Sequence, residues 1–212
     1  MNSFARLALP LLLVSLVPCT FACTLSGSTL GGLGGEPEAT GSLRVGDFVV
    51  YRYSGLFSPD PVTLRMEVLS REGDAIEIEY LMGRGEERRQ WIEILDVGLE
   101  REFPTLKALF EVVDGQRVSR PTSDQNQMLE WSRPQLDGFP REMRPAATVT
   151  LRIAGKPHEC EVSRGTGQVD GQAISISTFQ CPLFPWWNPG SEMVFVETGR
   201  PFHVMEVVDY SR

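Results

Sequence analysis

The stretch VTLRMEVLSREGDAIEIEYL, residues 62–81, decides the fold class. Apolar residues occupy alternate positions before and after a short polar sequence that ends in Gly73. A period of two is typical of strands with one buried face and one solvated face. A three-residue turn at 71–73, with Gly73 in the left-handed conformation, pairs residue 68 with residue 76. The stretch therefore predicts an antiparallel hairpin that covers a core.

Similar patterns along the chain predict a β-rich protein. Two segments, 104–113 and 123–132, predict short helices, and residues 133–146 predict a connection because they contain three prolines. The expected fold is mainly β, an antiparallel curved sheet or half-barrel with one or two short helices. Further strands are expected at 46–53, 88–96, 148–154, 158–164, 173–181, 192–198 and 202–209.

Length and charge limit the classes of function. A chain of 212 residues with 42% hydrophobic and 23% charged residues can form one domain with a substantial core. Its formal net charge is −8, and an acidic protein is repelled by phosphate backbones. We therefore expect no nucleic-acid partner.

Two of the four cysteines are expected to form a disulfide. Asp170-Gly171 is a preferred central pair for a two-residue type I′ hairpin turn. Counting outward from that turn places Cys160 directly opposite Cys181, in a non-hydrogen-bonded pair whose Cα atoms are close enough for a disulfide. A change in apolar parity after Ile176 indicates a bulge in the second strand. Two free thiols, or a metal site shared with His158, are the alternatives.

The N-terminus has the layout of a signal peptide. Arg6 precedes an apolar run over 7–17, and small residues lie before Cys23. The run is much shorter than the roughly 20 residues that a membrane-spanning helix needs. Residues 24–42 are rich in glycine and serine, and such a coil has an end-to-end distance of about 24 Å. The sequence therefore predicts a signal peptide over 1–22, followed by a flexible tether.

Thr20-Phe21-Ala22-Cys23 resembles the lipobox of bacterial lipoproteins. The resemblance implies cleavage before Cys23 and acylation of this cysteine with fatty acids such as palmitate. Two acyl chains make a nearly permanent membrane anchor, whereas one would be marginal. Thr24, in place of aspartate, favours the outer membrane by the same analogy. Cys19 is a second match, but the preceding proline should obstruct cleavage. Ordinary secretion with cleavage after Ala22 is the alternative.

The C-terminal part resembles a family of uncharacterised bacterial secreted proteins, many of them lipoproteins. The resemblance lies in a strand around Cys160, a second strand that ends in Cys181 and is followed by proline, and a terminal strand that ends in Asp209-Tyr210. It covers about 65 residues. It implies a β architecture and supplies no activity.

Motifs that would indicate catalysis are absent from the sequence. The two histidines, His158 and His203, do not form a His-Glu-x-x-His motif, and no Gly-x-Ser-x-Gly motif occurs. Strand alternation places His158 at the surface beside the disulfide, and His203 on the exposed face of the last strand. We therefore expect no catalytic residues, no metal, no cofactor and no enzymatic activity.

One loop has an unusual composition. Phe184, Trp186 and Trp187 lie among three prolines in CPLFPWWNPG, residues 181–190. Large aromatic side chains in a surface loop either pack over the core as a lid or contact a ligand or partner. The three residues are therefore candidates for such a contact.

These features predict a membrane-anchored, non-enzymatic lipoprotein of the bacterial cell envelope. Its body would lie in the periplasm or at the cell surface and bind an apolar ligand in a curved sheet. The alternative is a structural or interaction lipoprotein that docks an envelope protein. The expected organisation is a signal peptide (1–22), a lipidated cysteine and tether (23–42), and a single β-rich domain (43–212), divisible into halves at 43–114 and 147–212.

Overall fold

The structure, a computed structural model, describes residues 43–98, 104–137, 141–186 and 188–211. The predicted signal peptide, Cys19, Cys23 and the tether lie outside these residues. None of the described helices has the length and apolarity that crossing a membrane requires. The strands are β1 Phe48–Ser54, β2 Val62–Glu72, β3 Ala75–Arg84, β4 Glu87–Asp96, β5 Thr105–Val113, β6 Gln116–Arg120, β7 Arg141–Ile153, β8 Lys156–Val169, β9 Gln172–Gln180, β10 Gly190–Phe195 and β11 Pro201–Tyr210.

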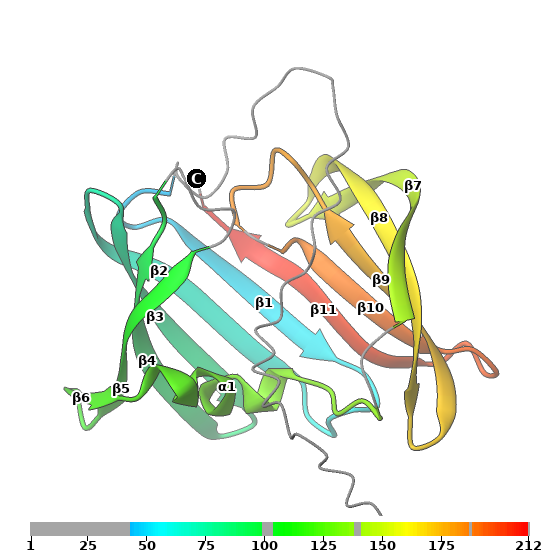
Figure 1. The fold of residues 1–212 in the computed structure, drawn as a ribbon, viewed down its shortest axis with the longest axis horizontal. Helices are drawn as coiled ribbons and strands as arrows, with labels where there is room; N and C mark the ends of the chain where they lie inside the picture. Colours follow the sequence, from blue (N-terminus) through cyan, green and yellow to red (C-terminus); the bar gives the residue numbers. More distant parts are fainter. Residues whose placement is uncertain (1–42, 99–103, 138–140, 187, 212) are drawn as a thin grey trace, which may run out of the picture. The chain divides into compact units, whose positions relative to one another are not determined.

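The eleven strands of the described residues form one antiparallel sheet. Their order is β6-β5-β4-β3-β2-β1-β11-β10-β9-β8-β7. The sheet therefore consists of two meanders, β1–β6 and β7–β11, which are joined where the first strand pairs with the last. Figure 1 shows a curved, open sheet, with β6 and β7 as its two edges. The predicted fold class, a mainly β protein with a curved antiparallel sheet, is confirmed.

Short helices cross one face of this sheet. They are η2 Thr122–Asp124, α1 Gln125–Met128 and η3 Glu130–Ser132, and they confirm the helical prediction for 123–132. Figure 1 shows α1 in front of the strands of the first meander. Met128 is buried in the core on this side of the sheet. We call residues 121–137 the covering segment.

The β2–β3 hairpin was predicted correctly as a hairpin but with the wrong register. Val68 pairs with Ile78, two residues further along than expected, and Glu72 pairs with Ala75 around a two-residue turn. Gly73 has the predicted positive φ, +60°. A bulge lies between Val68 and Ser70. A shift of two residues keeps every side chain on the same face, so the predicted apolar face is retained.

The predicted helix at 104–113 is wrong, because these residues form strand β5. Leu106, Leu109, Phe110 and Val113 have helical spacing, but a bulge produces it. Ile94 pairs with Ala108 while Leu95 pairs with Leu106, so Lys107 is an extra residue. A bulge of this kind shifts the alternation of one strand by one position. Strand β6 was missed altogether; all five of its residues are exposed.

The predicted connection at 133–146 is wrong in its last part, which belongs to β7. Pro145 lies within this strand, opposite Ser163 of β8, between two irregularities of register. A proline lacks an N–H donor, and sheets therefore accept it at edges and bulges. Because β7 is an edge strand, the proline here does not end the strand.

The β8–β9 hairpin has the predicted turn and register. Asp170 and Gly171 both have positive φ values, 49° and 73°, as a type I′ turn requires. The pairs run without a shift from Val169↔Gln172 to Glu161↔Gln180, so the bulge expected in this strand is not present between them. Cys160 and Cys181 are joined by a disulfide, with their Cα atoms 4.1 Å apart.

The turn glycine offers a test of the backbone conformation. A Cβ at Gly171 would meet nothing within 4 Å, so Gly171→Ala adds backbone strain without a clash. We expect it to lower the free energy of unfolding by about 1 kcal/mol, measured by urea denaturation. Ala154, at φ 45° in the β7–β8 turn, is the matched control. Ala154→Gly should not destabilise the protein, and equal losses in both variants would contradict the turn geometry.

The disulfide offers a second test. Its cysteines are 21 residues apart, and closing a loop of this length stabilises a folded chain by about 3 kcal/mol in the chain-entropy model. We expect the double variant Cys160→Ala/Cys181→Ala to lose about that much free energy of unfolding. The wild type under reducing conditions should lose a similar amount. An unchanged stability in both cases would show that the cross-link is absent or without effect.

Candidate functional site

The face of the sheet beneath the covering segment is rich in aromatic side chains. Alternation along β1 places Tyr51 and Tyr53 on this face, and both are buried. Tyr80 of β3 and Trp91 of β4 lie directly opposite each other, and their rings stack with centroids 5.0 Å apart. Burial raises the pKa of all three tyrosines well above their ordinary value. We call this surface the tyrosine face.

A buried carboxylate lies beside Tyr80 and Trp91 on the tyrosine face. Glu93 follows Trp91 by two residues in β4, so both side chains point the same way, and the Glu93 residue is 1% exposed. The indole Nε1 of Trp91 donates a hydrogen bond to Oε1 of Glu93 at 3.0 Å. The amide Nε2 of Gln125, in the covering segment, donates to Oε2 at 2.9 Å. Both carboxylate oxygens therefore accept hydrogen bonds from neutral groups.

The environment of Glu93 disfavours its ionised form. Burial raises the pKa of this carboxyl, while hydrogen bonds from Trp91, Gln125 and Tyr80 and the positive charge of Arg133 act in the opposite direction. Charged carboxylates rarely lie this deep unless they are paired. Sequence reasoning missed this residue. The sequence did contain a signal for it. Glu93 alternates with Trp91 and Leu95 in a predicted strand, so its side chain points to the same apolar face.

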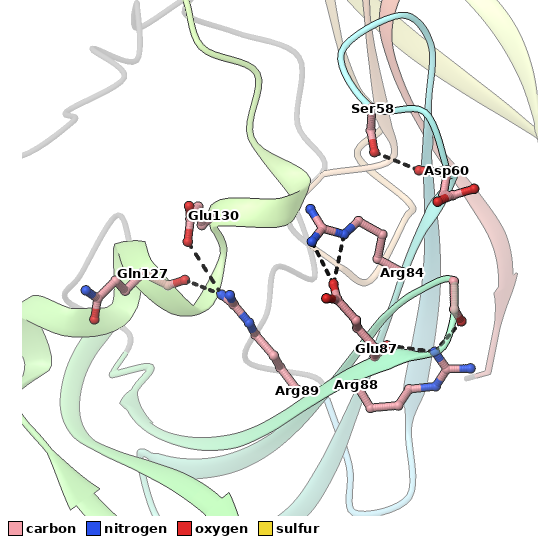
Figure 2. A network of polar contacts seen from close by, with 9 residues as sticks. Ser58, Asp60, Arg84, Glu87, Arg88, Arg89, Gln127 and Glu130 are labelled. Atoms are coloured by element: carbon pink, nitrogen blue, oxygen red, sulfur yellow. Dashed lines mark hydrogen bonds and ion pairs between the residues drawn. The ribbon is translucent and has the colours of Figure 1, made fainter.

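Arginine side chains attach the covering segment to the end of β3 and the start of β4. Nη1 of Arg89 donates to the carbonyl oxygen of Gln127 at 3.0 Å and lies 3.7 Å from the carboxylate of Glu130. Figure 2 shows Arg89 reaching the segment, while the neighbouring Arg84 pairs with Glu87. The guanidinium groups of Arg89 and Arg84 also lie 4.0 and 4.6 Å from the ring centroid of Trp131. Such cation–π contacts favour a fixed position for the indole.

His203 attaches the segment at a second point, and its predicted exposure is wrong. The residue is 3% exposed, and Nε2 donates to the carbonyl oxygen of Ser132 at 3.0 Å. Met193 pairs with His203 while Val194 pairs with Pro201. Phe202 is therefore an extra residue, and this bulge turns His203 to the buried side.

Neutral imidazole is the favoured form of His203. Nδ1 has no hydrogen-bond partner among the described residues, and the rings of Phe57 and Tyr53 lie beside it, at 4.6 and 5.9 Å. Burial lowers its pKa, and the hydrogen bond to Ser132 opposes this effect. An imidazolium here would have a buried, charged Nδ1–H with no hydrogen-bond acceptor among the described residues.

His158 lies beside the disulfide, as the sequence analysis expected, but it is half-buried. Its Nε2 lies 2.9 Å from the hydroxyl of Tyr210. Burial lowers its pKa. The described residues contain no group of three potential ligands that could hold a metal ion, and Cys160 is engaged in the disulfide.

The described aromatic residues of the loop at 181–190 pack over the core, which is the first of the two arrangements that the sequence allowed. Phe184 and Trp186 are buried in the main core, and Phe184 lies against Tyr210 with ring centroids 5.2 Å apart. Trp187 lies outside the described residues. The two described rings therefore have little surface for a ligand or partner, whereas the neighbouring Leu183 is exposed.

The comparisons with known proteins give similarities of fold at low identity. No family model matches the chain, and no curated protein matches it. Among solved structures, it is similar to MucB, with 12% identity and a TM-score of 0.43 over 78% of this chain and 53% of MucB, so the chain spans about half the length of that protein.

Two other solved structures have similar scores. The hypothetical protein CT021 from Chlamydia trachomatis matches with 9% identity and a TM-score of 0.46, over 82% of this chain and 89% of that protein. A candidate lipoprotein from Parabacteroides distasonis matches with 4% identity and a TM-score of 0.41, over 79% and 96%. At these scores the similarities assign no function.

The pH dependence of stability tests the environment of Glu93. Its pKa is raised above the ordinary value of 4.5. Between that value and the raised pKa, the folded chain keeps a proton that the unfolded chain has released. The free energy of unfolding contributed by this group therefore falls as the pH rises through that window.

Glu93→Gln cannot titrate, so its free energy of unfolding should fall less than that of the wild type between about pH 4 and pH 8. Urea denaturation at a series of pH values measures the difference. Glu79→Gln is the control, because Glu79 points to the opposite face and pairs with Gln90. If Glu93→Gln and the wild type had the same pH profile, the raised pKa would be wrong.

Proposed function

We propose that this chain is a lipid-anchored protein of the bacterial cell envelope that binds an apolar ligand on the tyrosine face. In this proposal Cys23 is acylated, residues 24–42 form the tether, and the β-rich body of residues 43–212 extends into the periplasm or from the cell surface. The outer membrane is the favoured site of anchoring, because Thr24 follows the acylated cysteine. The protein catalyses no reaction.

The observation that carries the proposal is how the tyrosine face is covered. The described strands all belong to one sheet, so within that part of the chain no second sheet packs against the aromatic side chains. The covering segment consists of one-turn helices. It is held to the sheet by side-chain hydrogen bonds, by ring contacts and by a backbone hydrogen bond from Asp137 N–H to the carbonyl oxygen of Gln168, without a β ladder. A large apolar face with so short a cover is suited to exchange that cover for a ligand.

The chemistry of Glu93 supports a binding role over a catalytic one. Both oxygens of the carboxylate accept hydrogen bonds, from Trp91 and Gln125. A general base must lie within hydrogen-bond reach of a substrate proton, and the partners of the two Glu93 oxygens here are the protein's own Trp91 and Gln125. These two hydrogen bonds hold the carboxylate in a fixed orientation, in which a ligand on the tyrosine face would contact it.

A second candidate function is docking of an envelope protein, and the filled core favours it. Met128 and Trp186 occupy positions in the main core, so the protein's own side chains already cover part of the apolar face. In this case the outer surface of the body would carry the interaction, and the covering segment would stay in place. The ligand test below separates the two functions.

The anchor is tested by fractionation of cells. Cys23→Ala should release the protein from membranes, because acyl chains on this sulfur are the proposed attachment. Cys19→Ala is the matched control and should stay in the membrane fraction. Membrane retention of the Cys23 variant, or release of the Cys19 variant alone, would contradict acylation at Cys23.

The ligand is tested by native mass spectrometry of the protein purified from its own membranes, with organic extraction of what dissociates. We expect an apolar compound that accompanies the body and leaves on extraction. A body that is free of bound apolar compounds, and that also takes up none when they are added, would favour the docking function.

A further inference from the structure

The covering segment brings a particular chemistry to the tyrosine face. It presents an N–H donor to Glu93, since the amide of Gln125 donates to Oε2 at 2.9 Å. It also brings the positive charge of Arg133, which favours the ionised form of the Glu93 carboxylate. A molecule that replaces the segment would have to provide similar groups, because a buried carboxylate that loses its partners is costly.

The side chains around the carboxylate favour the same chemistry. Tyr80 and Trp91 stack in parallel beside Glu93, with an interplanar angle of 12°. The faces of aromatic rings attract cations, and a carboxylate forms its strongest hydrogen bonds with charged N–H donors. An anionic headgroup would bring no N–H donor to the Glu93 oxygens, and it would add a like charge whenever that carboxyl is ionised.

We propose that Glu93 determines the ligand class, and that the tyrosine face takes apolar molecules with a protonated amine or other N–H-bearing cationic head. Ligands with a carboxylate or phosphate head are disfavoured. In the bound state the ammonium group occupies the position of the Gln125 amide on Oε2, and the apolar chain lies over the tyrosines. This inference rests on the proposed ligand-binding function.

Two probes of equal chain length test the inference. Dodecylammonium and dodecanoate share the same alkyl chain and differ in the sign of the head charge. Titration calorimetry with the mature protein, below the micelle concentration of each probe, gives both affinities. We expect dodecylammonium to bind at least about tenfold more tightly, which is the value of one charge-assisted hydrogen bond.

Three variants show whether Glu93 causes the preference. Glu93→Gln should reduce the preference to near equality. Glu79→Gln removes the same charge from the opposite face and should leave the preference unchanged, so it controls for the general attraction of an acidic protein for cations. Gln125→Ala keeps Glu93 and removes the competing donor, so it should bind dodecylammonium more tightly than the wild type does. Thermal unfolding of each variant shows whether it is folded.

The outcomes distinguish the preference for a cationic head from apolar binding itself. Equal affinities for the two probes, or a preference for dodecanoate, would overturn the inference and leave apolar binding intact. A preference that Glu79→Gln abolishes as fully as Glu93→Gln would overturn it as well. If neither probe binds to the wild type or to Gln125→Ala, the proposed ligand-binding function itself is wrong. If Glu93→Gln does not fold, the direction of change in Gln125→Ala decides.

Discussion

The pairing of β1 with β11 is the constraint on which the rest of the structure depends. Each meander is built from local hairpins, whereas this pairing joins residues far apart, such as Arg52 and Glu206, which are 154 positions apart. Pairing over such a distance has a large entropic cost of loop closure. It also brings Tyr51 and Tyr53 of the first meander beside Val207 and Met205 of the second. Without it the described strands would form two separate sheets of six and five strands, and the continuous face would be lost.

The continuous face made by this pairing explains the burial of polar groups. Glu93 and His203 come from different meanders. Glu93 accepts a hydrogen bond from the covering segment, and His203 donates one to it. An unpaired polar group in such a position would cost about 1–3 kcal/mol. The segment is therefore placed by polar contacts at several points between Gln125 and Asp137, and by the packing of Met128 in the core. These contacts fix the position of the covering segment on the sheet without a β ladder.

Period-two patterns were sufficient to predict the architecture, and bulges account for most of what they did not predict. The extra residue Lys107 gave β5 a helical spacing, and the extra residue Phe202 reversed the expected orientation of His203. A further bulge beside Val68 shifted the β2–β3 register. Bulges depend on the partner strand, which a single sequence does not specify. The β8–β9 hairpin has no bulge between its turn and its disulfide, and there the register followed directly from Asp170-Gly171.

The candidate site was less predictable than the fold. Parity with Trp91 could have identified Glu93 as an inward-pointing carboxylate, because both lie in a strand that alternation predicts. Its partner Gln125 could not have been found in this way, since the contact depends on how the covering segment crosses the sheet. The aromatic loop was recognised by composition, but composition does not distinguish a ring that packs inward from one that faces a partner.

The most direct test of this account is a cross-link between the two meanders. Arg52 lies directly opposite Glu206, and residues in such pairs have Cβ atoms about 4.5–5.5 Å apart. The variant Arg52→Cys/Glu206→Cys should therefore form an intramolecular bridge on oxidation or with a short bis-maleimide, read by intact mass. Arg52→Cys/Val204→Cys, a diagonal pair, should react much less. Thiols that stay free in the first variant, or that react only between molecules, would contradict a single sheet with one continuous face.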